Sequence, residues 1–204
     1  MPCSFEHESA LREQGIFFAA GIDEAGRGPL AGPVVAAAVV FCEQKFPDGL
    51  DDSKKLTPKR RDAIFAVLTS SAHVRWAVSV QEASVIDRIN ILRATHLAMA
   101  EAFSRLPGGA VHALIDGLPV PSFPAPQTAL VGGDGLSLSI AAASVIAKVT
   151  RDRIMDRHDA EYPQYGFSRH KGYGTREHLA ALREHGPSPI HRRSFAPVAQ
   201  AELF

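Results

Sequence analysis

The segment at residues 16–33 restricts the possible folds of this chain most, because an apolar run there ends in two adjacent acids and a glycine-rich loop. The run at 16–22 is rich in aromatic and β-branched residues, which predicts a buried strand. Asp23 and Glu24 follow, and two carboxylates in this position are costly to desolvate unless a cation or hydrogen bonds neutralise them. Oxygen ligands of this kind suit Mg²⁺ or Mn²⁺. Taken alone, the pair favours an acidic loop with a glycine turn, whereas the full string at 21–33 does not.

The residues after the acidic pair suit a close approach by a ligand. Gly26, Arg27 and Gly28 combine two positions without side chains and a forked guanidinium donor that fits a phosphate or a sugar edge. A second apolar run, at 34–41, follows this loop. The two runs therefore predict a β-hairpin or meander.

Helix start signals recur along the rest of the chain. Thr57 before Pro58 predicts one helix start, and Asn90 precedes a second pattern of apolar residues at helical spacing. An alanine-rich segment at 140–158 predicts a long helix, and Thr175 predicts the start of the last one. Strands followed by alternating helices and strands indicate an α/β or α+β domain.

A further acid ends a predicted strand. The apolar residues 110–115 lead into Asp116, and the prolines within 118–126 predict an irregular loop after it. If this strand lies beside the one that ends at Asp23, the two carboxylates meet at one edge of the sheet. An isolated Asp-Gly step is also typical of a turn, and Asp134 between glycines has the same alternative.

Composition predicts an ordinary globular protein. With 204 residues, 46% of them hydrophobic and 22% charged, the chain can bury a core as one domain. The longest apolar run is too short to span a bilayer, and residues 1–14 lack the features of a secretory signal. Cys3 and Cys42 have neither zinc-like nor disulfide-framework spacing. We therefore expect no membrane association and a cytoplasmic location.

Charge is unevenly distributed although the net charge is +0. Counting along the sequence, residues 1–50 hold 7 acids and 3 bases, whereas residues 144–193 hold 10 bases, 6 acids and five histidines. A basic end of this kind suits a partner with phosphates, although asymmetry of this size is common on solvated surfaces.

The chain resembles the type 2 ribonuclease H (ribonuclease HII) family in a series of motifs that occur in the family's order. They lie at 21–33 (the acidic and glycine-rich string), 52–56 (DSKKL), 90–92 (NIL), 114–117 (LIDG), 143–152 (ASVIAKVTRD), 165–167 (YGF), 170–173 (HKGY) and 191–195 (HRRSF). The resemblance covers nearly the whole chain. It implies hydrolysis of the RNA strand of RNA–DNA hybrids and cleavage at ribonucleotides embedded in DNA.

The resemblance also implies an α/β architecture, the ribonuclease H-like fold. This is a mixed five-stranded sheet flanked by helices, with a C-terminal helical extension. We therefore expect a polar N-terminal tail at 1–14, a catalytic domain at 15–160, and the extension at 161–204 packed on the same domain.

In the resembling family, four acids bind two divalent ions, Mn²⁺ or Mg²⁺, and catalyse hydrolysis. The matching positions here are Asp23, Glu24, Asp116 and Asp134. One departure accompanies the last acid, because Gly132 replaces the lysine of the family's Lys-Gly-Asp segment. This departure puts a nearby backbone contact in doubt and not the ligand itself.

The resemblance implies a second set of residues that contact the nucleic acid. Gly26, Arg27 and Gly28, together with Tyr173, match the positions that recognise a ribonucleotide at an RNA-to-DNA junction. The other matching positions are Ser53, Lys54, Ser144, Lys148 and Lys171. For Ser144 and Lys148 the alternative is the solvated side of a helix, with Arg151 at the same face paired to Asp152 or Asp156.

The histidines show no zinc-binding pattern, so a surface role for His178 and His185 is favoured over a metal site. The sister type 3 ribonuclease H is a weaker match, because it carries an added N-terminal domain and a different glycine motif. A catalytically silent hybrid-binding protein or an interaction module would not need four acids. We expect a monomer, and the ending Leu203-Phe204 only faintly matches a sliding-clamp motif.

Overall fold

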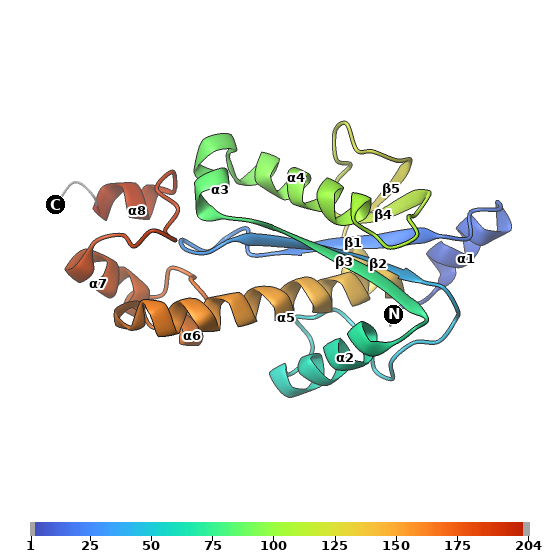
Figure 1. Cartoon of the computed structure of the whole chain (residues 1–204), viewed down its shortest axis with the longest axis horizontal. Helices are drawn as coiled ribbons and strands as arrows, with labels where there is room; N and C mark the ends of the chain where they lie inside the picture. The colour runs from blue at the N-terminus through green and yellow to red at the C-terminus, as the bar shows by residue number, and fades with distance from the viewer. Residues whose placement is uncertain (1–2, 202–204) are drawn as a thin grey trace.

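A five-stranded sheet forms the centre of the computed structural model, which describes residues 3–201 (Figure 1). Its strands are β1 (Ala19–Ala25), β2 (Val34–Phe41), β3 (Val74–Gln81), β4 (His112–Asp116) and β5 (Gln127–Leu130). They lie in the order β3-β2-β1-β4-β5. β1 pairs antiparallel with β2 and parallel with β4. The predicted mixed five-stranded sheet is thus confirmed.

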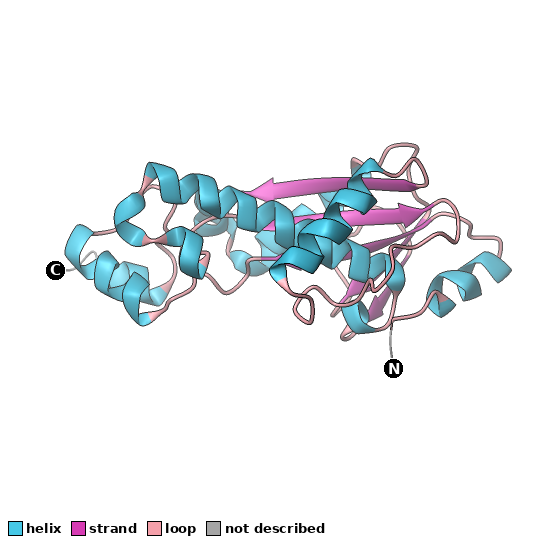
Figure 2. Cartoon of the chain, turned by 90° about the horizontal axis from the view of Figure 1, so that it is seen from below, coloured by secondary structure: helices cyan, strands magenta, loops and turns pink. Residues whose placement is uncertain are grey.

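Helices cover both faces of this sheet. α4 (Ile91–Ser104) lies on one face, whereas α5 (Leu138–Glu161) crosses the other and α2 (Pro58–Ser70) lies beside it (Figures 1 and 2). Strand alternation explains the two cores, because successive side chains point to opposite faces. On β2, Ala36 and Ala38 pack against Met99 and Phe103 of α4. The intervening residues of β2 pack against α2 and α5.

Three smaller helices, α6 (Phe167–His170), α7 (Arg176–His185) and α8 (Ala196–Ala201), follow α5 and form one end of the molecule (Figure 1). Backbone hydrogen bonds connect this end to the loop after β1. Leu30 donates to Gly172, Gly32 donates to Ile190, and Arg192 donates to Leu30, each at 2.8 Å. The loop after β1 is therefore held by residues that lie about 140 to 160 positions away in the sequence.

The helix starts predicted from capping residues are confirmed. The side chains of Thr57, Asn90 and Thr175 each accept a hydrogen bond from the backbone N–H three residues later. The irregular loop at 118–126 is also found. The helix capped by Thr175 is not the last one, because α8 follows it.

Two sequence predictions near the N-terminus are wrong. The residues predicted as a polar tail contain α1 (Glu6–Glu13), which buries Leu11 and places the Glu8 carboxylate on the Ser139 N–H at the start of α5. An anion at a helix N-terminus is favourable, which explains why an acidic segment docks there. The first strand begins at Ala19 and not at Ile16, because the residues before it form the turn out of α1.

The sequence predictions also omit β3, β5 and the short helix α3 (Ala83–Ile89). No helix among residues 3–201 is long and apolar enough to cross a membrane.

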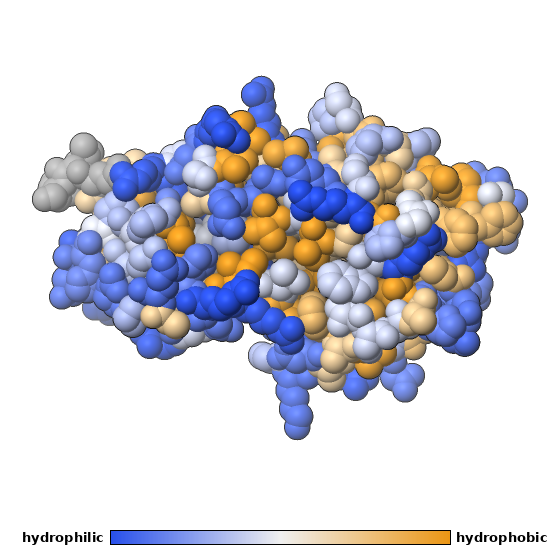
Figure 3. Space-filling view, in the orientation of Figure 1, coloured by the Kyte–Doolittle hydropathy of each residue, from blue (hydrophilic) through white to orange (hydrophobic). Residues whose placement is uncertain are grey.

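On the face shown in Figure 3, hydrophilic residues are concentrated over the end formed by α6 and α7. More hydrophobic residues lie over the middle of that face.

Candidate metal and nucleic-acid site

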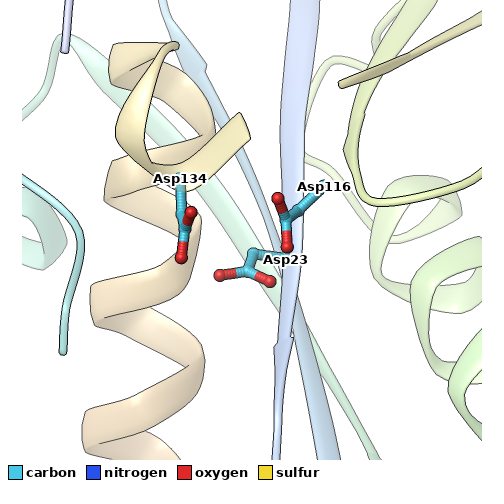
Figure 4. Close-up of side chains that lie close together, drawn as sticks. All are labelled: Asp23, Asp116 and Asp134. Atoms are coloured by element: carbon cyan, nitrogen blue, oxygen red, sulfur yellow. The ribbon is translucent and has the colours of Figure 1, made fainter. Parts of the chain in front are cut away.

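Three aspartates meet where β1 and β4 end and α5 begins. Ile22 pairs with Ile115 in the parallel ladder, so Asp23 and Asp116, one residue further on, lie side by side. Asp134 comes from η1 (Gly133–Gly135), the single turn that precedes α5. Each of these aspartates offers a carboxylate oxygen within 4.8 Å of the others (Figure 4). The sequence prediction that strand ends bring Asp23 and Asp116 together agrees with this geometry.

Glycine makes the close approach of α5 to β1 possible. A Cβ atom at Gly21 would lie 2.1 Å from the Ser139 carbonyl carbon, so only a residue without a side chain fits there. Because alternate residues share a face, Gly21 and Asp23 both point to the α5 side of the sheet. The Gly133 N–H donates to Asp116 Oδ1 at 2.7 Å, which fixes the turn containing Asp134 beside the strand ends.

The carboxylates are crowded enough to raise one another's pKa. Burial, and then the charges of Glu24 and Asp116, raise the pKa of Asp23 well above its usual range. The pKa of Glu24 is raised by burial against the opposing effect of Arg27, and that of Asp116 by burial and the charge of Asp134. Each shift shows that the ionised form is disfavoured in the protein alone.

Two cations partly offset this negative charge, and both extend from exposed positions. Lys54 Nζ donates to Asp134 Oδ2 at 2.9 Å, and this hydrogen bond raises the pKa of the lysine. Arg27 Nη1 donates to Glu24 Oε1 at 3.3 Å. Neither cation contacts the carboxylate of Asp23, which receives a backbone N–H from Glu24 at 2.7 Å. The buried centre of the cluster therefore keeps an excess of negative charge.

This donor set fits a hard divalent cation. Three buried or half-buried carboxylates, with no nitrogen or sulfur donor among them, match the oxygen ligands of Mg²⁺ and Mn²⁺. Asp23, Asp116 and Asp134 could hold such an ion directly. Glu24, the next residue on β1, is close enough to interact with Asp116 and lines the same pocket.

A pocket of about 410 Å³ opens over the acidic cluster. Most of the predicted nucleic-acid contacts lie around it, namely Gly26, Arg27, Gly28, Ser53, Lys54, Lys148 and Tyr173. A larger cavity, of about 580 Å³, lies between α7 and α8. It is lined mainly by apolar side chains and lies away from the carboxylates. The candidate site is therefore identified by the acidic residues that line the smaller pocket and not by cavity volume.

Comparison with known proteins identifies the relatives of this chain. The family model for ribonuclease HII matches residues 20–198. The chain belongs to the ribonuclease HII family. The ribonuclease HII of Geobacillus kaustophilus is 54% identical over 194 residues, which cover 95% of this chain and 74% of that protein. The ribonuclease HII of Geotalea daltonii is 52% identical over 199 residues, which cover 98% of this chain and 92% of that protein.

Solved structures support the same assignment. The ribonuclease H2 of Pyrococcus horikoshii superposes with a TM-score of 0.75 at 27% identity, covering 91% of this chain and 97% of that one. Bst-RNase HIII in complex with Mn²⁺ superposes with a TM-score of 0.72 at 19% identity and shows the shared fold. As a ribonuclease HII, the chain is a hydrolytic endonuclease that degrades RNA in RNA–DNA hybrids, and the family needs a divalent metal.

Two predicted contact residues of this ribonuclease HII lie outside the pocket. Ser144 is buried, donates to the Ala141 carbonyl at 2.8 Å and accepts from the Ser53 N–H at 3.2 Å, so it holds the segment that carries Ser53. Lys171 lies in an adjacent groove and forms an ion pair with Asp156. Lys148 lines the pocket itself and pairs with Asp152 at 2.8 Å.

The ribonuclease HII departure at Gly132 has a local explanation. Gly132 adopts a left-handed backbone conformation with φ of 69°, which glycine tolerates best. A Cβ atom there would meet nothing within 4 Å. A lysine at this position would therefore face backbone strain without a steric clash.

The alternative considered for Arg151 is wrong. Its side chain is not on a solvated helix face and does not pair with Asp152 or Asp156. It is 1% exposed and donates to the carbonyls of Ala31, Pro33 and Lys171. The helical spacing correctly placed it on one face, but that face is covered by the loop after β1 and by the residues after α6.

The favoured surface role for His178 is also wrong. His178 is 0% exposed and its Nε2 lies 3.0 Å from Nε2 of His191, which is 1% exposed. Burial lowers the pKa of His178 and lowers that of His191 to about 3. Since His178 Nδ1 lies 2.9 Å from the Tyr173 carbonyl and His191 Nδ1 accepts the Ser188 N–H, two neutral rings satisfy every contact.

Arg192 is a functional candidate that the motif series contains without assigning a role. This residue is 0% exposed, and its guanidinium donates to the backbone carbonyls of Gly26 and Arg27. No periodicity in the sequence indicates this contact, because Arg192 follows α7 in an irregular segment. The Leu203-Phe204 ending considered for a sliding clamp lies outside the described residues.

Proposed function

We propose that this ribonuclease HII cuts 5′ of ribonucleotides embedded in duplex DNA, in addition to hydrolysing the RNA strand of RNA–DNA hybrids. The proposed products are 3′-hydroxyl and 5′-phosphate ends. The observation that supports this best is the meeting of Asp23, Asp116 and Asp134 beside a glycine loop and an exposed tyrosine. A phosphodiester placed over the acids would have its sugar next to that loop.

The proposed chemistry is two-metal-ion hydrolysis with Mg²⁺ or Mn²⁺. Asp23, Glu24, Asp116 and Asp134 would hold the ions. When bound, such ions supply a nucleophilic water and neutralise charge on the attacking and leaving oxygens. The protein's own contribution is the fixed placement of the carboxylates, by the β1–β4 register and by the Gly133 N–H on Asp116.

We assign recognition of the sugar to the other side of the pocket. A Cβ built at Gly28 would lie 3.6 Å from the Tyr173 ring. Tyr173 is 47% exposed and can pack its ring on a deoxyribose. The Arg27 and Gly28 N–H groups could bond a 2′-hydroxyl, the group that distinguishes RNA from DNA. Lys54 and Lys148 would neutralise phosphates.

Cleavage mapping tests this proposal. A DNA duplex with one internal ribonucleotide is incubated with the protein and Mg²⁺ or Mn²⁺, and the end-labelled products are compared with an all-DNA duplex. We expect one cut 5′ of the ribonucleotide and none in the all-DNA duplex. Absence of that cut, or a cut elsewhere with hybrid cleavage intact, would remove embedded ribonucleotides from the proposal.

We further propose that the protein acts as a monomer in the cytoplasm, in the removal of RNA primers and of misincorporated ribonucleotides. The free thiols of Cys3 and Cys42 support a reducing compartment. One structural neighbour, from Archaeoglobus fulgidus, is a PCNA:RNase HII complex that superposes with a TM-score of 0.73 at 27% identity. A sliding clamp is therefore a reasonable partner to test for this chain.

A further inference from the structure

The Arg192 guanidinium lies behind the glycine loop and binds its backbone carbonyls. Its Nη2 donates to the Gly26 carbonyl at 2.5 Å, its Nη1 to the Arg27 carbonyl at 2.9 Å, and its Nε to the Gly32 carbonyl at 3.0 Å. Among residues 3–201, no carboxylate forms an ion pair with it within 4.0 Å. All three hydrogen bonds of this buried cation therefore act on one loop.

These contacts fix the direction of two peptide planes. The C=O and N–H of a trans peptide point in opposite directions, and the described chain contains no cis peptide. With the Gly26 and Arg27 carbonyls on Arg192, the N–H groups of Arg27 and Gly28 point the other way. Neither N–H donates to another described residue, and both residues line the pocket above the acids.

The Arg192 side chain is itself held in place. Its backbone N–H donates to Leu30 at 2.8 Å, the Gly32 N–H donates to Ile190, and its guanidinium lies 5.2 Å from the Phe195 ring centre. Burial and the charge of Arg151 lower the pKa of Arg192 to about 9, so it stays charged at neutral pH. Burying a charge without a carboxylate partner is costly, which indicates a role beyond packing.

We propose that Arg192 is a positioning residue for ribonucleotide recognition: it orients the Gly26–Gly28 backbone so that the Arg27 and Gly28 N–H groups face the substrate. The assignment deepens the proposed function and rests on it. Three donors in a rigid planar fork are required for this role, and lysine cannot reproduce them because its donors radiate from one nitrogen. Residues after α7 thereby control a specificity element that follows β1.

The first test compares Arg192→Lys and Arg192→Met with Phe103→Leu, a core variant under α4 on the other face of the sheet. We measure kcat/KM for a duplex with one ribonucleotide and for a long RNA–DNA hybrid, at temperatures where each variant is folded. Loss of one preorganised donor costs roughly 10²-fold, and we expect a loss of this order on the single-ribonucleotide duplex for both Arg192 variants. We expect a smaller loss on the long hybrid, and an unchanged ratio for Phe103→Leu. Equal losses on both substrates, or full rescue by lysine, would overturn the proposal.

The second test does not depend on activity. Amide hydrogen exchange of the peptide covering residues 26–33 is measured in the wild type, Arg192→Lys and Phe103→Leu. We expect exchange to accelerate by roughly tenfold or more in Arg192→Lys, because the Leu30 and Gly32 N–H bonds lose their support. Unchanged exchange there would contradict the positioning role. If the loop loosens in Arg192→Lys while the wild type fails to cut the single-ribonucleotide duplex, the proposed function fails and the positioning contact stands.

Discussion

Two groups of buried charged side chains lie within this protein, and they differ in how their charges are compensated. The acidic cluster at the ends of β1 and β4 contains Asp23, Asp116 and Asp134, whose negative charges are only partly offset. Behind the same loop, Arg151 and Arg192 are just as buried, but the hydrogen bonds of their guanidiniums end on backbone carbonyls.

This difference distinguishes a candidate ion-binding site, the acidic cluster, from a structural element, the buried arginines. Buried carboxylates that repel one another destabilise the fold until a cation binds, so the protein keeps them at a cost in stability. Each buried arginine donates three hydrogen bonds to backbone carbonyls and is closed to solvent, so it holds the neighbouring loop in place. The acidic cluster provides the chemistry, whereas the buried arginines provide the geometry.

The largest expected effect follows from removing one charge of the acidic cluster. We expect Asp23→Asn and Asp116→Asn each to lower kcat by about 10³-fold or more, because several kcal/mol of charge stabilisation by the ions is lost. The raised pKa of both carboxyls means that the ionised forms destabilise the folded state at neutral pH. The Tm of the ion-free variants should therefore equal or exceed that of the wild type. Activity within a few-fold of wild type at saturating Mg²⁺ and Mn²⁺ would contradict the assignment of the acids.

The opposite result is expected on the arginine side. Arg151→Met leaves the carbonyls of Ala31, Pro33 and Lys171 without their donor, and each unsatisfied buried group costs about 1–3 kcal/mol. We expect the free energy of unfolding to fall by roughly 3 kcal/mol or more, measured by urea denaturation. If the variant were as stable as the wild type, water would have replaced the guanidinium. The claim that the buried arginines stabilise the fold, whereas the buried acids destabilise it, would then be contradicted.

A smaller effect should separate the two substrates. Tyr173 lies at the exposed rim of the pocket, so Tyr173→Ala removes a ring that we assign to the deoxyribose side of an RNA-to-DNA junction. We expect kcat/KM on a single embedded ribonucleotide to fall by about tenfold, as for loss of one stacking contact. The loss on a long hybrid should be smaller, because many registers and phosphate contacts remain. Lys148→Ala serves as the matched control, since loss of a phosphate contact should weaken both substrates alike. Equal losses for Tyr173→Ala would make the ring structural.

The last prediction concerns pH. Burial lowers the pKa of His191 from its usual value near 6.5 to about 3. At pH values between these two, the unfolded state binds a proton that the folded state does not. Stability contributed by this group is therefore lost as pH falls from about 6.5 toward 3, by about 1.4 kcal/mol per pH unit. His191→Asn should make the free energy of unfolding less dependent on pH between pH 6.5 and 5. An identical pH slope in the variant and the wild type would place the acid sensitivity elsewhere.

The sequence predicts the acidic side of this comparison much better than the arginine side. Asp23 and Asp116 follow apolar runs directly, and neighbouring parallel strands necessarily bring their ends together. Thr57, Asn90 and Thr175 have local capping chemistry that needs no knowledge of the fold. Such signals lie within a few residues of the structure that they specify.

Arg151, Arg192 and the His178–His191 pair depend on contacts across many residues of sequence. Arg192 bonds Gly26 across 166 positions, and nothing near either residue indicates that they meet. A helical arginine such as Arg151 has the same local pattern whether solvent or a loop covers its face. The strand β3 is a different case, because its alternation of apolar and polar residues at 74–81 was available in the sequence.

The claim that the acidic cluster is a divalent-ion site is tested most directly by ion-dependent stability. Thermal unfolding of the wild type and of Asp23→Asn is followed while Mn²⁺ is titrated, with Ca²⁺-free buffer and the variant Phe103→Leu as a destabilised control. We expect the Tm of the wild type and of Phe103→Leu to rise with Mn²⁺ concentration, because the ion binds only the folded protein. At a hundredfold excess of Mn²⁺ over Kd, the free energy of unfolding should increase by about 2.7 kcal/mol. Asp23→Asn should show little or no rise. An equal rise in Asp23→Asn and the wild type would place the bound ion elsewhere and contradict the account.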